Sequence, residues 1–409
     1  MNILLVTQIY PEPDDGKGYE ATKTVEYFAR EWVEAGHKIV VMHCPSRFPF
    51  IYYMVPEFLK NELRKRTYIL VPTWSSTKAV YKQEYGIEVY RQPMRKWIPS
   101  QAYTRQAMSE QCHIIKKILE EINFVPDLVA GHFSNPSTEL VRRLSKMYCA
   151  MSSIVFHNDC TPKNIKKYRI RENIEGIKAI GARSIVEAVS IKEQLRLQDL
   201  PFICYSGVPN DAIEINDRTC FKQDYKDGIQ FLYVGGLVQK KHVDAVITAY
   251  SGLREKHGEI NVSLKIMGGG SEEKELREMV RKLRLIDSVC FTGRRPRKEV
   301  LNEMKSAHVF TMISQGETFG MVYLEAMLQG CLVIASKGGG FDGIVEDGIN
   351  GFLCEAGDAQ MLETIYEQII EMDTKQRNLI GQRAIDTAIQ FSERTVAQRY
   401  LNDVIKRNQ

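Results

Sequence analysis

Two glutamates stand eight positions apart in the segment SQGETFGMVYLEAMLQG, residues 314–330. The apolar run HVFTMIS before it predicts a buried strand, and MVYLEAMLQ predicts a helix that ends at Gly330. Unpaired N–H groups at the start of such a helix attract an anion, and a phosphate suits that position. Glu317, just before the helix, would then face a sugar whose hydroxyl groups donate hydrogen bonds. Glu325, about 12 Å further along the helix, could accept hydrogen bonds from a ribose diol.

One helix could therefore contact the sugar, the diphosphate and the ribose of a nucleotide sugar. The same residues also fit a simpler interpretation. Glu317 would be a carboxylate near the helix start that the helix dipole favours, and Glu325 would be a solvated surface charge.

Short apolar runs and helical patterns alternate along the whole chain. NILLVTQIY and KIVVMHC flank a segment with helical spacing, and DLVAGHF, SSIVFHND and IKAIGARS follow. A second series begins at IQFLYVGGL and continues with SLKIMGGG, VCFTGRR, HVFTMIS and CLVIASKGGG. The pattern predicts an α/β fold with two doubly wound Rossmann-like domains facing a cleft, and ligand-binding loops at the carboxyl ends of the strands.

The domain boundary is expected near the segment CYSGVPNDAIEIND. Residues 1–207 would form the first domain and residues 208–391 the second. The C-terminal helix, residues 392–409, is expected to pack back on the first domain. Its apolar residues lie on one face; they are Val396, Tyr400, Leu401 and Val404.

The composition is that of a soluble globular enzyme. The chain has 409 residues, too many for one ordinary core, with 44% hydrophobic and 26% charged residues. It has no run of eighteen apolar residues, and its first segment lacks the basic region of a signal peptide. Nine cysteines without a C-x-x-C pair are typical of reduced, buried thiols. A cytoplasmic location is therefore expected.

Positive charge is concentrated in one part of the chain. The net charge is +4, but residues 47–117 carry thirteen Lys and Arg against five Glu, a net of +8, which leaves −4 for the remainder. Aromatic residues are interleaved with these basic residues. The mixture suits an anionic membrane surface at the inner face of a membrane and a lipid-linked acceptor. A solvated basic face over buried aromatic side chains fits equally, whereas no nucleic-acid-binding motif accompanies the charge.

The segment ETFGMVYLEAMLQGCLVIASKGGG resembles the E-x7-E segment of retaining GT-B glycosyltransferases, the large family of glycosyl transferases group 1. FLYVGGLVQKKHVDAVITAY is similar to the family's nucleotide-diphosphate strand and loop, and LKIMGGGSEEKEL, VCFTGRRPRKEV and IVEDGINGFL resemble the segments that accompany it. In the first half, AGHKIVVM and SGVPND resemble the second strand and the hinge. The resemblance covers nearly the whole chain and implies the GT-B fold.

The resemblance implies roles for residues of the second domain. Lys241 matches the lysine that neutralises the donor diphosphate, and Glu317 matches the catalytic glutamate that positions the donor sugar near its anomeric carbon. Glu325 matches the glutamate that binds the ribose. The remaining matches would contact the donor through the backbone: Thr318, Phe319 and Gly320 at the phosphate, and Arg294 at the base.

Two matches fall in the first domain. Gly18, in the turn after the first strand, matches a glycine whose missing side chain lets the diphosphate approach. An ordinary loop glycine fits as well, because Lys17 splits the family's usual glycine pair. His132 matches a catalytic histidine that ends a strand and faces the sugar, with a structural histidine as the alternative. His157 is a further candidate.

The resemblance implies a retaining hexosyltransferase that needs no metal or other cofactor. It would move a sugar from a nucleotide-diphosphate donor, expected to be a UDP-sugar, to a glycan or lipid-linked acceptor in bacterial surface polysaccharide or glycoconjugate synthesis. Gly236 departs from the family, which usually has arginine there, so one diphosphate cation is missing. This departure favours the alternative of a non-catalytic transferase-like partner or glycan-binding subunit. A nucleotide-sugar epimerase with the same architecture is a third interpretation.

Overall fold

The computed structural model describes residues 1–11, 23–56, 59, 79–98, 101–214, 225 and 228–409. The chain divides into two compact units. The first contains Met1–Arg183, Glu187–Cys204 and Val396–Gln409, and the second contains Ser184–Val186 and Tyr205–Thr395. The division after Cys204 lies three residues before the expected boundary at 207.

Parallel strands form the core of the first unit. They lie in one sheet in the order β10-β9-β8-β7-β1-β2-β5-β4, in which β4 and β5 pair antiparallel. Along the sheet these strands are β10 (Phe202–Ile203), β9 (Ala179–Ala182), β8 (Met151–Val155), β7 (Leu128–His132), β1 (Asn2–Thr7), β2 (Lys38–His43), β5 (Ile87–Arg91) and β4 (Val80–Glu84). The apolar runs of β1 and β2 are buried after their first residue, as expected for strands that are covered on both faces.

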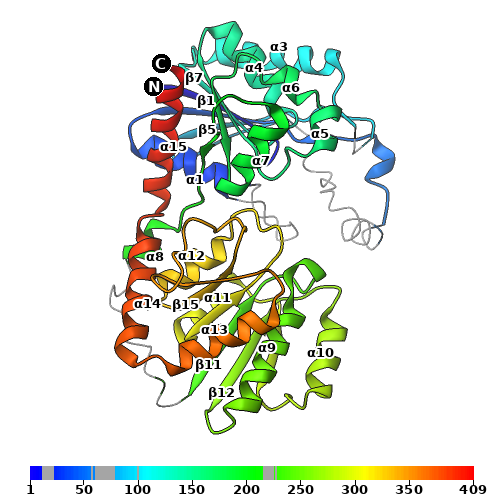
Figure 1. Ribbon diagram of the computed structural model, residues 1–409. Coiled ribbons are helices and arrows are strands. Elements are labelled where there is room, and N and C mark those ends of the chain that lie inside the picture. The colour runs from blue at the N-terminus through cyan, green and yellow to red at the C-terminus, as the bar shows by residue number, and fades with distance from the viewer. Residues whose placement is uncertain (12–22, 57–58, 60–78, 99–100, 215–224, 226–227) are drawn as a thin grey trace. The chain divides into compact units, whose positions relative to one another are not determined.

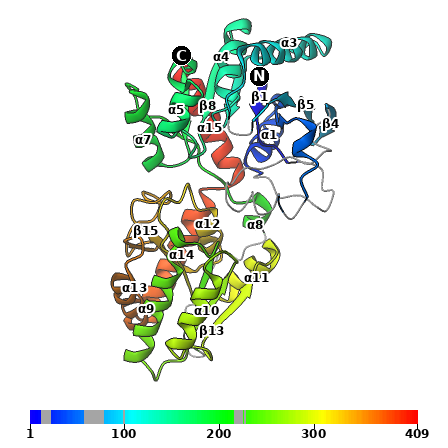
Figure 2. The ribbon, with the colours of Figure 1, turned by 90° about the vertical axis from the view of Figure 1, so that its right-hand side faces the viewer.

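Helices cover this sheet. In both views α1 (Thr24–Glu34) lies beside α15 (Glu393–Asn408) (Figures 1 and 2). Elsewhere α3 (Arg105–Glu121) packs on α4 (Ser137–Tyr148), and α4 packs on β7 and β8. The remaining helices here are α5 (Pro162–Lys167), α6 (Ile170–Asn173) and α7 (Ile185–Leu195).

The C-terminal helix α15 buries one face in the first unit. Its four apolar positions are all buried: Val396, Tyr400, Leu401 and Val404. The indole N–H of Trp32 on α1 donates to the carbonyl of Ala397 at 2.9 Å. The Tyr400 ring packs against Trp32 and Phe28, with centroid distances of 5.1 and 5.2 Å. Residues far apart in the chain are thus held together by apolar packing and a buried hydrogen bond.

The second unit is a smaller, wholly parallel sheet between two helix layers. Its strands follow the order β13 (Val289–Gly293), β12 (Val262–Met267), β11 (Ile229–Val234), β14 (Val309–Met312), β15 (Leu332–Ser336) and β16 (Phe352–Cys354). One layer contains α10 (Glu273–Lys282), α9 (Val243–Lys256) and α13 (Ala359–Glu371), and the other α11 (Arg297–Ser306), α12 (Met321–Leu328) and α14 (Thr374–Ile389). The strand order reverses between β11 and β14, and ligands bind at the carboxyl ends of strands at such a point. The short helix α8 (Asn210–Glu214) precedes this sheet.

Two features of the basic segment were not predicted from the sequence. β4 and β5 form a hairpin whose turn holds Tyr85 and Gly86 at φ values of 51° and 75°. The second feature is a short parallel pair, β3 (Ser46–Arg47) with β6 (Met94–Arg95), which is separate from the main sheet.

Replacing Trp32 with Phe should destabilise the first unit by about 1–3 kcal/mol, because it removes a buried donor and leaves a cavity. The matched control is Trp97→Phe, since that indole is 74% exposed and should change stability by about 0.5 kcal/mol or less. Urea unfolding followed by far-UV circular dichroism gives both values. Equal shifts in the two variants would contradict the packing of α15 on α1.

Candidate active site

The segment between β14 and α12 ends in a turn that favours glycine. Gly320, the residue before α12, has φ 86° and ψ 58°, in the left-handed region. A Cβ atom at Gly320 would lie 2.4 Å from the ring of Tyr323, whose hydroxyl donates to the carbonyl of Met312 in β14. The turn places Glu317 just before the unpaired N–H groups that begin α12.

Glu317 contacts Lys241, a residue 76 positions earlier in the chain. The Lys241 ammonium donates to a carboxylate oxygen of Glu317, and it lies 3.5 Å from the hydroxyl of Ser314. The two charged side chains are only 16% and 19% exposed, so water screens this pair less than a surface pair. Lys241 and Glu317 therefore form an ion pair beside the start of α12. The family resemblance implied separate partners for them, the diphosphate for Lys241 and the sugar for Glu317.

Two loops are tied together to make this contact. The 3-10 turn η3 (Gln239–Lys241) follows β11, and the amide of Gln315 donates to the carbonyl of Lys240 at 2.7 Å. His242 has φ 48°, and its ring packs on Gly357, where a Cβ atom would lie 2.8 Å from Nδ1 of His242. The loop after β14 is thus anchored to the loop after β11.

The loops after β11 and β12 approach more closely than residues with a Cβ atom would allow. A Cβ at Gly268 would lie 1.8 Å from the carbonyl oxygen of Gly235, and one at Gly270 would lie 2.1 Å from that of Leu237. The amide of Leu237 donates to the carbonyl of Gly269 at 3.2 Å. Glycine at positions 268 and 270 is therefore required by backbone contact.

Gly236 and Arg294 lie at the exposed edge of these loops. A Cβ at Gly236 would have its nearest neighbour, Val238, at 4.0 Å, so there is room for a larger side chain. The exposed Arg294 runs past Gly269, with its Cγ 3.5 Å from where a Cβ of that glycine would lie. The local backbone therefore does not require glycine at position 236.

The segment that was predicted to hold phosphate packs on the loop after β15. A Cβ at Gly340 would lie 2.4 Å from the carbonyl of Thr318, a close approach that the sequence marks only as one glycine in a run of three. The ring of Phe319 is 3% exposed and packs on Tyr205 and Phe341, with both centroid distances 5.8 Å. The Phe319 side chain belongs to the core. This segment can therefore contact a ligand only through its backbone and through Thr318.

Glu325 lies on α12 and pairs with Arg297, the first residue of α11. The distance from a guanidinium nitrogen to the Glu325 carboxylate is 2.5 Å, and the carboxylate side chain is 13% exposed. Burial raises the pKa of Glu325, and Arg297 opposes that shift. Sequence inspection missed Arg297, because a helix-start arginine 28 positions away from its partner carries no local signal.

Of the first-domain candidates, Gly18 lies outside the described residues. His132 ends β7 and is fully buried. Its Nδ1 lies 3.0 Å from Nε2 of His157, and its Nε2 lies 3.4 Å from the hydroxyl of Tyr400. Burial, and secondly the charge of Arg183, lowers the pKa of His132 to about 3. The ring is therefore neutral and enclosed, and it does not present a nitrogen to solvent as the resemblance implied.

His157 is the member of this pair that reaches the surface. Its side chain is partly exposed and stacks on Phe133 with a centroid distance of 4.0 Å. The amide of His157 donates to Asp159 at 3.0 Å, and the other oxygen of Asp159 accepts from the amide of Ser134. Burial lowers the pKa of His157 as well, with smaller effects from Arg183 and His132. His132 thus orients a second imidazole that lies nearer to solvent.

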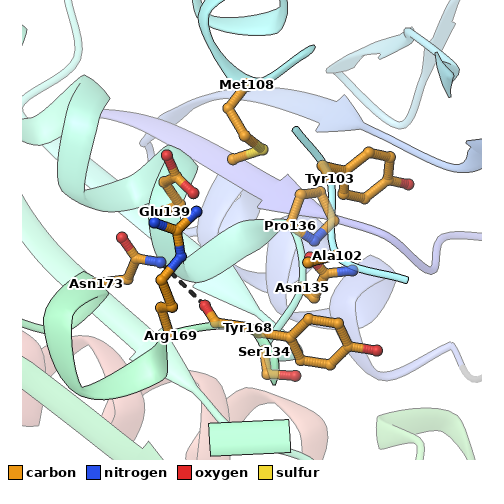
Figure 3. Close-up of a pocket in the computed structure, with 10 residues that line it drawn as sticks. All are labelled: Ala102, Tyr103, Met108, Ser134, Asn135, Pro136, Glu139, Tyr168, Arg169 and Asn173. Carbon is orange, nitrogen blue, oxygen red and sulfur yellow. Dashed lines mark hydrogen bonds between the residues drawn. The ribbon is translucent and has the colours of Figure 1, made fainter. Parts of the chain in front are cut away.

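A pocket opens in the first unit beside the end of β7 (Figure 3). Its polar lining comes from Tyr103, Ser134, Asn135, Glu139, Tyr168, Arg169 and Asn173. Glu139 is already paired with Arg143 at 2.9 Å. Arg169 has φ 50° and forms no ion pair with a described residue. The pocket is therefore left with an uncompensated cation at its wall.

A second cation is buried next to this wall. Lys96 is 6% exposed, and its ammonium lies 4.8 Å from the centroid of the Tyr103 ring. Burial, and then the charge of Lys167, lowers the pKa of Lys96 to about 8. No acidic side chain in the described parts of the chain pairs with Lys96. Two cations, Arg169 and Lys96, therefore lie at or beside the wall of the pocket without a carboxylate partner of their own among the described residues.

The described residues include no group of three or more His, Cys, Asp or Glu side chains placed to hold a metal ion. In those same parts of the chain, no helix combines the length and the apolar character that a membrane span requires.

Comparison with known proteins finds a match to a family model in the second unit. Residues 219–387 match the model of glycosyl transferases group 1. The match covers less than half of the chain. It contains Lys241, Glu317 and Glu325, so the charged residues described above lie within the family's own region.

Curated relatives match part of the chain. N-acetyl-alpha-D-glucosaminyl L-malate synthase of Bacillus anthracis is 27% identical over 208 residues, which cover 47% of this chain and 53% of that protein. D-inositol 3-phosphate glycosyltransferase of Corynebacterium kroppenstedtii is 27% identical over 177 residues, covering 42% of this chain and 39% of that protein. The chain spans about half the length, or less, of these curated relatives.

A solved structure resembles the whole chain. HepE of Anabaena in complex with UDP superposes with a TM-score of 0.67 and 19% identity, over 99% of this chain and all of that one (100%). At this identity the likeness concerns the fold. The predicted GT-B fold, built from two Rossmann-like domains, is confirmed.

Protonation of His132 should contribute to acid sensitivity. An unfolded histidine accepts a proton below its usual pKa of 6.5, whereas the folded His132 does so only near pH 3, so stability is lost as pH falls between these values. His132→Gln should therefore lose about 2 kcal/mol less than the wild type between pH 6.5 and 5. Urea midpoints at the two pH values measure this difference.

His113→Gln is the matched control, because His113 is exposed on α3 and the variant retains His132. It should lose as much stability on acidification as the wild type. An unchanged pH dependence in His132→Gln would contradict the neutral, enclosed state of that ring.

Proposed function

We propose that this protein is a retaining glycosyltransferase, which moves a sugar from a nucleotide-diphosphate donor to an acceptor hydroxyl. The observation that carries the proposal is the ion pair of Lys241 and Glu317 beside the start of α12, with Glu325 on the same helix. The match of residues 219–387 to the model of glycosyl transferases group 1 supports it. The UDP bound to HepE supports a uridine nucleotide as the donor.

In this proposal Lys241 and the first amides of α12 bind the donor diphosphate. An ammonium group has three N–H donors, so Lys241 can keep its bond to Glu317 and still donate to a phosphate oxygen. The leaving diphosphate gains negative charge as the glycosidic bond breaks, and a cation and a helix N-terminus stabilise that charge. Gly320 lets the backbone come close, because it lacks a side chain.

The two glutamates would act on different parts of the donor. Glu317 lies before α12, where a sugar would follow the diphosphate, and it would accept hydrogen bonds from sugar hydroxyl groups. Glu325 would accept from the ribose, and its pair with Arg297 keeps the carboxylate oriented and charged against the opposing effect of burial. The donor would thus be held from both ends of one short helix.

The transfer step would retain the anomeric configuration. The bond from the anomeric carbon to the diphosphate oxygen breaks, and the acceptor oxygen bonds to the same face of the sugar. The acceptor proton passes to the departing phosphate. The proposal includes no metal or other cofactor. His132 acts as a positioning residue for His157 in this scheme, because its own ring is enclosed.

The acceptor would carry an anionic group. The pocket of the first unit is bordered by Arg169, and the buried Lys96 lies next to its wall without a carboxylate partner. An acceptor phosphate or carboxylate would supply that missing negative charge. The names of the relatives support this inference, since one acts with L-malate and the other with inositol 3-phosphate. A lipid-linked phosphate or a glycan bearing an acidic group has the same chemistry.

The experiment that tests the proposal is release of nucleoside diphosphate. UDP-sugars incubated with the protein and acidic acceptors should yield UDP and a glycosylated product, and release should depend on the acceptor. The specific alternative is a non-catalytic homologue, which the glycine at position 236 favours. That alternative predicts binding of UDP without turnover. Conversion of the donor with no acceptor present would instead indicate an epimerase.

Replacing Lys241 with Ala should weaken UDP binding by about 1.5–3 kcal/mol while leaving uridine binding nearly unchanged, because the lost contact is to phosphate. Lys240→Ala is the matched control, since Lys240 is the adjacent, exposed lysine. Titration calorimetry with both ligands measures the effects. If Lys241→Ala weakened UDP and uridine equally, Lys241 would not face the phosphates.

We further propose that the enzyme works at an anionic membrane surface. β3 and β6 pair in parallel, with Arg47 opposite Arg95. Five exposed apolar side chains follow these two strands in the sequence: Phe50, Ile51, Met54, Trp97 and Ile98, each 45–74% exposed. Apolar side chains flanked by arginines suit the interface of an acidic bilayer. The densest basic cluster, Arg64, Lys65 and Arg66, lies outside the described residues.

The double variant Ile51→Ser, Trp97→Ser should bind vesicles containing phosphatidylglycerol at least about tenfold more weakly, because each inserted apolar side chain contributes about 1–2 kcal/mol. Cosedimentation measures the binding, which should fade as salt rises. Ile286→Ser is the control, since that residue is 63% exposed in the second unit. If the wild-type protein did not bind acidic vesicles at low salt, that result would favour a soluble acceptor.

A further inference from the structure

An open groove lies at the opposite edge of the first sheet from the candidate site. His132 and the acceptor pocket are at the carboxyl ends of the strands, whereas this groove is at the amino ends of β8 and β9. Its lining includes Arg142, Lys146 and Cys149 from the end of α4, Ser152 of β8, Lys178 before β9 and Asn408 of α15. The end of α15 lies beside β8 and α4 in Figure 2.

Three cations converge on this groove. Arg142 and Lys146 are four residues apart on α4 and so project from the same face of the helix, where like charges repel. Lys178 comes from a different element and faces the same groove. Glu175 is the acidic residue of the lining, and no ion pair within the described parts of the chain joins it to these cations. The groove therefore concentrates positive charge that the protein itself does not neutralise.

The neighbouring residue on α4, Arg143, has acceptors within the protein. The Arg143 guanidinium donates to Glu139 at 2.9 Å and to Ser109 at 3.1 Å. In contrast, Nε of Arg142 has no solvent-exposed surface and no hydrogen-bond partner in the described structure. The Arg142 guanidinium therefore has no acceptor within the described protein, and an oxyanion in the groove would bind it through its other nitrogens.

The groove is built on a fixed frame. The amide of Ser152 donates to Asn408 at 2.9 Å, and Asn408 donates back to the carbonyl of Ser152 at 3.3 Å and to that of Val404 at 2.8 Å. The amide of Lys178 donates to the hydroxyl of Ser152 at 3.0 Å. These bonds join β8, β9 and α15, so the backbone around the cations is held in place before any ligand arrives.

We propose that this groove binds a small phosphorylated molecule through Arg142, Lys146 and Lys178. A phosphate group offers several acceptor oxygens and more than one negative charge, which matches one guanidinium and two ammonium groups better than a single carboxylate does. The site lies within the first unit and is separate from the residues assigned to sugar transfer. It is therefore independent of the proposed reaction.

Cys149 supplies a local reporter for the test. It is a free, exposed thiol in the lining of the groove, and Cys290 in the second unit is also free and exposed. Alkylation by iodoacetamide, followed by peptide mass spectrometry, gives a separate rate for each cysteine. Inorganic pyrophosphate should slow alkylation of Cys149 about threefold or more, because a bound anion disfavours the thiolate and blocks access. The rate at Cys290 should not change.

The controls separate binding from a salt effect. Sodium chloride at the same ionic strength should leave the Cys149 rate nearly unchanged. Arg142→Gln should abolish the protection by pyrophosphate, and Lys178→Gln, which changes an exposed side chain and so keeps the fold, should abolish it or weaken it severalfold. Lys163→Gln, another exposed lysine of the first unit, should retain full protection.

Three results would overturn the proposal. One is an unchanged Cys149 rate at about 10 mM pyrophosphate, a concentration well above the dissociation constant of a specific site. Another is protection that persists in both Arg142→Gln and Lys178→Gln. The third is equal slowing by sodium chloride. None of these outcomes bears on release of UDP, so failure here would leave the proposed transferase activity intact.

Discussion

A carboxylate that is largely removed from water needs a positive partner, and Lys241 satisfies that need for Glu317 beside the start of α12. The two residues come from loops after different strands, β11 and β14, which are neighbours in the sheet. Their contact therefore depends on both loops adopting fixed paths. The bond from Gln315 to Lys240 and the packing of His242 on Gly357 set those paths. The ion pair therefore forms because these contacts fix the two loops.

The same geometry explains the many glycines of this unit. Gly268 and Gly340 are each pressed against a neighbouring backbone at distances that no Cβ atom could share. A glycine that tolerates such contact brings two loops within hydrogen-bonding range, and it leaves peptide groups near any bound ligand. Gly236 does not belong to this set, because its surroundings are open. Its difference from the family pattern therefore concerns charge and not backbone space.

Local sequence patterns predicted much of the fold and of the donor-side site. The parallel strands follow apolar runs, and α12 occupies Met321–Leu328 within the expected helix, because both signals depend on neighbouring residues. The hairpin of β4 and β5 was missed, although Tyr85 and Gly86 between alternating strands were a usable signal. The partners of Glu325 and His132 could not be predicted. Arg297 and Tyr400 reach them through tertiary packing, and in the case of Tyr400 across 268 positions.

Lys96 is the residue whose environment is hardest to explain by folding alone. Its ammonium is removed from water and rests over the ring of Tyr103, yet a pKa of about 8 keeps it mostly protonated at neutral pH. A cation–π contact recovers only part of the cost of burying a charge. Lys167 increases that cost, because it is a second cation that lowers the same pKa. A buried lysine next to a pocket, with no carboxylate partner among the described residues, is better understood as a site prepared for an anion. Under the proposed function, the negative charge that would stabilise it arrives with the acceptor.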